Sequence, residues 1–161
     1  MMKKQTALLL VGFLMGAAVL DAHVVVTPRE ATAGAEQVYT VRAPAEGTVS
    51  STSIELEIPL GLHVMRVDAG EGFAFDVRKE KDRIVAITWT REIKAKEFAL
   101  FTFTAHNPAS GQLQWKAHQA FADGSMRHWV GERGTKEPAS VTTIVPKGSA
   151  TVTPADPAHK H

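Results

Sequence analysis

The chain has 161 residues, of which 44% are hydrophobic and 22% are charged, a balance typical of one compact domain with a hydrophobic core. Lys and Arg number 18 against 17 Asp and Glu, so the formal charge of +1 argues against nucleic acid as a partner. The absence of cysteine excludes disulfides, thiol catalysis and cysteine-based zinc or iron–sulfur sites. Any metal site must therefore use nitrogen and oxygen ligands from His, Asp or Glu.

The N-terminal segment is typical of a secretory signal peptide. Two lysines, Lys3 and Lys4, precede an apolar run from Ala7 to Leu20, and the small residue Ala22 suits the position before a cleavage site. The run is shorter than the ~20 apolar residues that a bilayer span needs. We therefore expect residues 1–22 to be removed, which leaves a periplasmic or secreted protein without a membrane anchor.

Cleavage after Ala22 makes His23 the first residue of the mature chain, so one residue carries both an α-amine and an imidazole. These two groups can bind a metal together, through the amine and Nδ1, in a six-membered chelate ring. Nitrogen donors in a tetragonal arrangement favour Cu(II), which also has the highest affinity among the divalent ions. The amine must lose its proton, which costs little near neutral pH. The alternative is that a histidine stands first by coincidence.

The mature chain is predicted to be all-β, because short runs rich in Val, Ile, Thr and Phe recur between turn residues without a long segment of helical periodicity. Their spacing indicates a sandwich or barrel. Asp123-Gly124 between two runs predicts a hairpin, and residues 146–161 are predicted to form a disordered tail. The predicted strands are His23–Thr27, Glu36–Ala43, Ser53–Ile58, Val64–Val67, Phe73–Arg78, Ile84–Trp89, Phe98–Ala105, Gln112–Phe121, Met126–Val130 and Val141–Val145.

Three glutamates are candidates for completing a metal site at His23. If the first two strands run antiparallel across a turn near Thr32–Ala35, His23 lies level with the end of the second strand, close to Glu46. Glu55 and Glu57 follow on the polar face of the next strand and are also within reach. Each of them is otherwise a solvated surface glutamate, which is the more frequent case.

The other aromatic and imidazole side chains have simpler interpretations. Trp89 and Trp115 are predicted to pack in the core, whereas Trp129 lies just past the hairpin turn, near the rim of the domain. None of the remaining histidines forms a compact metal-ligand spacing within a predicted strand, and most are expected at the surface. His159 and His161 are most simply part of a short basic end. These remaining histidines are His63, His106, His118, His128, His159 and His161.

Several segments, taken in order, match one family. They are the mature start His23–Pro28, Val41–Glu46, Ile54–Pro59, the pair Glu97-Phe98 before Phe101–Phe103, and Gln119–Ser125 followed by Trp129. Together they resemble the YcnI-like family of extracytoplasmic copper-binding proteins, over essentially the whole mature domain. Where relatives have Gly-Trp in the middle of the domain, this chain has Gly72-Phe73.

The resemblance implies a cupredoxin-like or immunoglobulin-like β-sandwich over residues 23–145 that binds one Cu(II) ion by a single-histidine brace. A carboxylate and a tryptophan complete the environment of the ion. His23 matches the histidine of the family's brace, and Trp129 matches the tryptophan near the ion. Glu46 matches the recurrent Pro-x-Glu and Glu55 an acidic position in the following strand, so both remain candidates for the carboxylate.

The main hypothesis is a copper carrier or chaperone in copper trafficking or homeostasis that is not an enzyme and exchanges copper with another copper-transfer protein or a copper transporter. A copper-dependent oxidase or monooxygenase is the alternative, although lytic polysaccharide monooxygenases need a second histidine in the brace and nothing in the sequence assigns one. A metal-free periplasmic adhesion or assembly sandwich is the third class. Binding of Cu(II) by the processed protein separates the third class from the first two.

Overall fold

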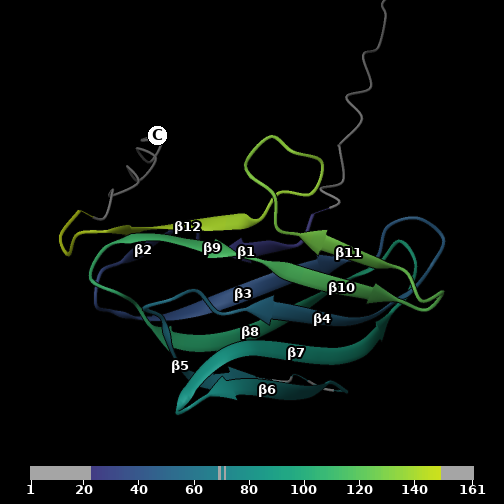
Figure 1. Ribbon diagram of the computed structural model, residues 1–161, viewed down its shortest axis with the longest axis horizontal. Helices are drawn as coiled ribbons and strands as arrows, with labels where there is room; N and C mark the ends of the chain where they lie inside the picture. Colours follow the sequence, from purple (N-terminus) through teal and green to yellow (C-terminus); the bar gives the residue numbers. More distant parts are fainter. Residues whose placement is uncertain (1–22, 69, 71, 150–161) are drawn as a thin grey trace, which may run out of the picture.

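The computed structural model describes residues 23–68, 70 and 72–149, so the predicted signal peptide and most of the predicted tail lie outside the described residues. This part of the chain consists of strands and contains no helix that could cross a membrane (Figure 1). The strands are β1 (Val25–Thr27), β2 (Glu30–Thr32), β3 (Glu36–Pro44), β4 (Ser51–Glu57), β5 (His63–Asp68), β6 (Ala74–Glu80), β7 (Arg83–Ile93), β8 (Phe98–His106), β9 (Gly111–Trp115), β10 (Ala117–Phe121), β11 (Met126–Trp129) and β12 (Ser140–Val145).

The strands form three sheets, which confirms the predicted all-β sandwich. One sheet has the order β1-β3-β8-β5, a second has the order β11-β10-β4-β7-β6, and a small third sheet has the order β2-β12-β9. Figure 1 shows the third sheet along one side of the molecule, above β3. The first two sheets contact each other through aromatic rings, such as Trp89 of β7 and Phe101 of β8, whose centroids are 5.1 Å apart.

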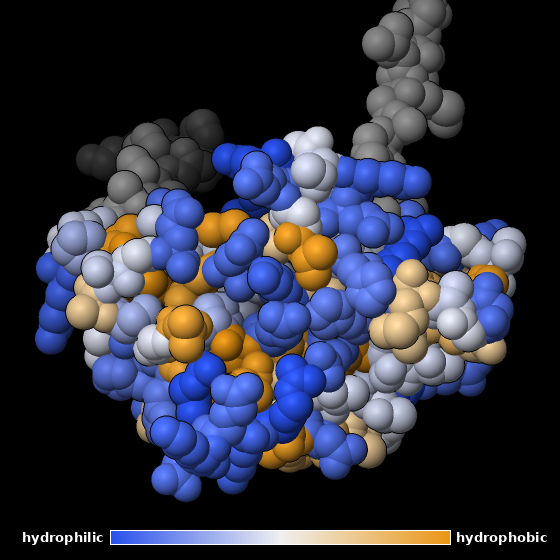
Figure 2. Space-filling model, viewed as in Figure 1, coloured by the Kyte–Doolittle hydropathy of each residue, from blue (hydrophilic) through white to orange (hydrophobic). Residues whose placement is uncertain are grey.

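Alternation of side chains along the strands explains the core. In β4, Ile54 and Leu56 are fully buried, while Glu55 and Glu57, which alternate with them, are partly exposed. Side chains of a strand point alternately to its two faces, so each strand places one row in the core and the other row toward solvent. On the face drawn in Figure 2, hydrophilic residues accordingly cover most of the surface, and hydrophobic ones appear in separate groups between them.

The set of strands differs from the predicted set in two ways. The predicted strand Gln112–Phe121 is divided at Lys116, because β9 pairs with β12 whereas β10 pairs with β4 and β11. Inward side chains continue through the division, as Trp115 and Ala117 are both buried, so a period of two cannot reveal the change of sheet. The short strand β2, which pairs in parallel with β12, was not predicted. It is only three residues long.

Candidate metal centre

The position of His23 follows from the pairing of β1 with β3. The two strands are antiparallel and Val25 pairs with Arg42, so the register places His23 level with Pro44, as predicted. Val24 and Val26 are buried. The N–H of Val26 donates to the hydroxyl of Ser140 in β12 (3.0 Å), and that hydroxyl donates back to the Val26 carbonyl (3.3 Å). These contacts on both sides of β1 hold the start of the mature domain in place.

The ring of His23 packs against the ring of Trp129. Their centroids are 5.3 Å apart and their planes meet at 72°, an edge-to-face arrangement. His23 is partly exposed, whereas Trp129 is only 2% exposed and belongs to the hydrophobic core along with Trp89 and Trp115. The structure therefore brings together two of the residues that the sequence analysis selected, although they are more than 100 positions apart in the chain.

A buried glutamine connects Trp129 with the end of β3. The indole N–H of Trp129 donates to Oε1 of Gln119 (3.3 Å), and Nε2 of Gln119 donates to the carbonyl of Pro44 (2.7 Å). Gln119 is 1% exposed, so both ends of its amide are satisfied within the protein. The sequence analysis did not select it. The sequence feature that could have identified it is a polar residue at an inward position of a strand whose apolar and polar residues alternate.

Glu46 lies just beyond the end of β3, in a segment held by backbone hydrogen bonds. Ala45 receives a hydrogen bond from Lys96 (2.6 Å) and donates one to the carbonyl of Glu97 (2.8 Å). The Glu46 side chain is partly exposed and makes no hydrogen bond or ion pair within the described part of the chain. Its carboxylate thus has no protein partner that a metal would need to displace.

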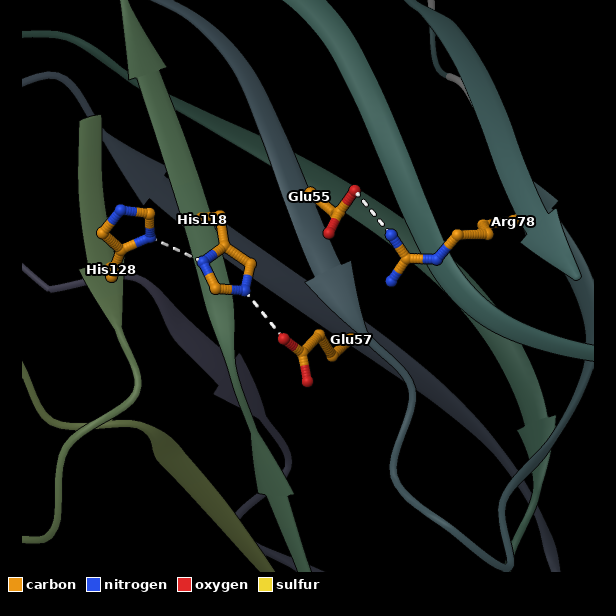
Figure 3. Close-up of polar contacts among 5 residues, drawn as sticks. All are labelled: Glu55, Glu57, Arg78, His118 and His128. Atoms are coloured by element: carbon orange, nitrogen blue, oxygen red, sulfur yellow. Dashed lines mark hydrogen bonds and ion pairs between the residues drawn. The ribbon is translucent and has the colours of Figure 1, made fainter. Parts of the chain in front are cut away.

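Glu55 and Glu57 lie on the outer face of β4 and both have partners there (Figure 3). Glu55 is 3.5 Å from the guanidinium of Arg78 on β6. Glu57 is 2.8 Å from Nε2 of His118 on β10. Inward neighbours such as Leu56 are buried on the other face of the same strand, so the two glutamates belong to a different surface from the core around Trp129.

A cleft of about 560 Å³ lies beside β1, with His23 among its lining residues. Glu132 and Arg133, which follow β11, also line this cleft and were not selected from the sequence. Within the described residues, no three His, Asp or Glu side chains form a group able to hold a metal on their own. The imidazole of His23 and the carboxylates of Glu30 and Glu132, which line the same cleft, are nitrogen and oxygen donors of the kind that suits Cu(II).

The fold and this site define an immunoglobulin-like β-sandwich with a partly exposed histidine at its first strand. A solved protein from Nocardia farcinica with an immunoglobulin-like fold superposes with a TM-score of 0.66 and 24% identity, covering 76% of this chain and 98% of that one. A cohesin module from a Clostridium perfringens family 33 glycoside hydrolase superposes with a TM-score of 0.53 and 12% identity, covering 78% and 99%. These similarities support the fold alone.

The chain belongs to the family described as "Domain of unknown function (DUF1775)", whose model matches residues 23–147. It is also 32% identical over 128 residues to "Copper-binding protein CutI" of Bacillus subtilis (strain 168). That alignment covers 77% of this chain and 63% of the relative, so the chain spans less than two thirds of the relative's length. These matches confirm the resemblance to YcnI-like proteins. The relative that matches most of this chain is described as a copper-binding protein.

Proposed function

We propose that the mature protein binds one Cu(II) ion at its N-terminus and acts as a periplasmic or secreted copper carrier. The observation that carries the proposal is the packing of the His23 ring against Trp129 at the anchored start of β1. The family membership and the similarity to a copper-binding protein support copper as the cargo.

In this proposal, His23 supplies two ligands, the α-amine that cleavage creates and Nδ1 of the imidazole. Glu46 supplies a carboxylate, because the pairing of β1 with β3 places His23 level with Pro44 and the Glu46 side chain has no other partner among residues that the structure describes. Glu55 is the second candidate for the carboxylate, and its ion pair with Arg78 would have to open. The π face of Trp129 shields the ion from water and favours Cu(I) relative to Cu(II), which helps copper to be released on reduction.

The role of the α-amine is tested with one preparation before and after proteolysis. A chain that retains residues 19–22 carries its α-amine four residues away from His23, and a protease cut directly before His23 restores the mature end. We expect Cu(II) affinity, measured by competition against a chelator, to rise by about tenfold or more after the cut. Equal affinity before and after the cut would contradict the single-histidine brace.

The carboxylate is tested with a matched pair of isosteric variants of the mature protein. Glu46→Gln removes a charge beside the proposed site, whereas Glu55→Gln removes the partner of Arg78 on the outer face. We expect Glu46→Gln to weaken Cu(II) binding and to change the electron paramagnetic resonance spectrum, and Glu55→Gln to leave both unchanged. The opposite result would assign the ligand to Glu55, and an effect of neither variant would place the carboxylate elsewhere, with Glu57 next.

The carrier role is separated from the alternative of a copper oxidase or monooxygenase by turnover. A carrier loaded with Cu(II) is expected to pass its ion to a stronger chelator after reduction and to show no oxidant-driven turnover of a substrate. The cleft beside His23 gives an acceptor protein or a copper transporter access to the ion. Sustained consumption of oxidant by the loaded protein in the presence of a substrate would instead support the enzyme.

A further inference from the structure

We infer that the outer face of the β10–β11 hairpin carries a second copper site, formed by His118 and His128. The two residues are direct partners in the antiparallel register, and their Nδ1 atoms are 2.8 Å apart. Figure 3 shows the two imidazoles turned toward each other, with Glu57 on the far side of His118. The inference does not rest on the N-terminal site, because its two ligands, His118 and His128, take no part in that site.

The spacing of the two nitrogens matches a tetragonal metal ion. Two ligand atoms each about 2.0 Å from one ion are about 2.8 Å apart when they subtend about 90°, and about 3.3 Å apart at a tetrahedral angle. The observed 2.8 Å corresponds to neighbouring positions of a square-planar site, which Cu(II) prefers. Both nitrogens can therefore bind one Cu(II) ion once the two rings turn from facing each other to facing the ion, and water completes the coordination.

Glu57 prepares His118 for this role. Its carboxylate lies 2.8 Å from Nε2 of His118, and an ionised carboxylate only accepts hydrogen bonds, so Nε2 carries the proton. Neutral His118 then has its lone pair on Nδ1, the atom that faces His128. Without metal, the Nδ1–H of His128 donates to this lone pair. When an ion binds Nδ1 of both rings, His128 gives up its Nδ1 proton to solvent and takes one up at Nε2, so the ring stays neutral. A carboxylate that orients a metal-binding histidine through its other ring nitrogen is a frequent arrangement in metal sites.

The hairpin keeps the two histidines in register. The turn between β10 and β11 is closed by Asp123, whose carboxylate accepts hydrogen bonds from the backbone N–H (2.9 Å) and the hydroxyl (2.6 Å) of Ser125. Gly124 occupies the turn with φ of +82°, a conformation that glycine adopts readily. His118 also lies on a strand bonded on both sides, to β4 and to β11. A site on such a hairpin loses little conformational entropy when it binds an ion.

The neighbouring charges favour a cation. Glu55 is the register partner of His118 on β4, so carboxylates lie next to His118 in two directions along this face. The guanidinium of Arg78 is held by Glu55 at 3.5 Å. The side chain of His118 is 21% exposed and that of Glu57 is 41% exposed, so an ion from solution can enter.

His128 is adjacent to Trp129 in sequence but points to the opposite face of β11, since Trp129 is buried. The two proposed copper sites therefore lie on opposite sides of the same hairpin.

The test uses Cu(II) titration of the chain that retains residues 19–22, in which the α-amine is displaced from His23. We expect this protein to bind one Cu(II) ion at the hairpin and to lose it, with at least about a tenfold fall in affinity, in His128→Gln. Paramagnetic broadening of the imidazole proton signals of His118 and His128 should accompany the binding. Glu57→Gln should retain the ion but bind it about tenfold more weakly, because His118 loses its orienting partner.

A second histidine pair serves as the matched control. His63 of β5 and His106 of β8 are also register partners and both are exposed, but no contact joins their rings. His106→Gln should leave copper binding of the same protein unchanged. Retention of the ion in His128→Gln, or an equal loss in His106→Gln, would overturn the inference. Failure of the N-terminal proposal is distinguishable, because it appears as equal binding before and after the cut at His23, whatever the histidine variants do.

Discussion

The buried tryptophans differ in one respect that a pair of substitutions can measure. Trp129 and Trp89 are both buried, but the indole N–H of Trp129 donates to Gln119, whereas that of Trp89 has no hydrogen-bond partner among the described residues. Phenylalanine at either position removes the N–H and part of the ring. Both variants therefore lose apolar volume. They differ in whether the substitution leaves a buried polar group without a hydrogen-bond partner or removes one that has none.

The expected magnitudes follow from that difference. Trp129→Phe leaves the Oε1 atom of Gln119 buried without a donor, at a cost of about 1–3 kcal/mol beyond the lost volume. Trp89→Phe removes a buried donor that has no acceptor, which recovers a similar desolvation penalty. The cost in one variant and the gain in the other add, so we expect Trp129→Phe to lower the free energy of unfolding by about 2–6 kcal/mol more than Trp89→Phe does.

The assay is equilibrium unfolding of the metal-free mature protein in urea. With a slope of about 2 kcal/mol per molar urea, the two midpoints should differ by about 1–3 M. Trp115→Phe provides an intermediate case, because the indole N–H of Trp115 donates to the hydroxyl of Thr142, which also donates to the carbonyl of Pro28 and so keeps one partner. An equal or larger loss of stability in Trp89→Phe than in Trp129→Phe would refute this assignment of hydrogen bonds.

Two further predictions concern the pKa of a buried phenol and a close backbone approach. Burial raises the pKa of Tyr39, the single tyrosine of the chain, to about 12, so tyrosinate absorbance should develop in the folded protein near pH 12 and not near pH 10. Because this pKa is higher in the folded state, its contribution to stability is complete below pH 10 and is lost as the pH rises through 12. Gly131→Ala should lower the thermal unfolding midpoint, because the added Cβ collides with the Thr135 hydroxyl and lies 3.0 Å from the carbonyl oxygen of Glu137. An unchanged midpoint would contradict the packing of this loop.

Agreement between sequence and structure is best where a property is local. The alternation in Ile54–Ile58 predicted a strand with one wet face, and β4 has that pattern of burial. The Asp123-Gly124 pair predicted the hairpin, and β10 and β11 are its two strands. The antiparallel pairing of β1 with β3, and hence the position of His23 beside the end of β3, was also predicted correctly.

Agreement fails where a property depends on which strands become neighbours. The predicted strand Gln112–Phe121 changes sheets at Lys116 while its inward row continues unbroken, so nothing local marks the change. His118 was expected to be a surface residue without a role, because its partners Glu57 and His128 lie on other strands. Gln119 likewise gains its function as a connector only when Pro44 and Trp129 lie on either side of it.

The sequence by itself determined the fold class, the family and the candidates His23 and Trp129, because strand periodicity, turn residues and motif order are written along the chain. The tertiary structure alone decided that the rings of His23 and Trp129 meet and that two histidines converge on the outer face of a hairpin. It also decided that, within the described part of the chain, Glu55 and Glu57 have partners and the Glu46 carboxylate has none. The physical reason is that a side chain's neighbours across strands depend on sheet order and register. Those follow from the packing of the whole core and not from any one segment.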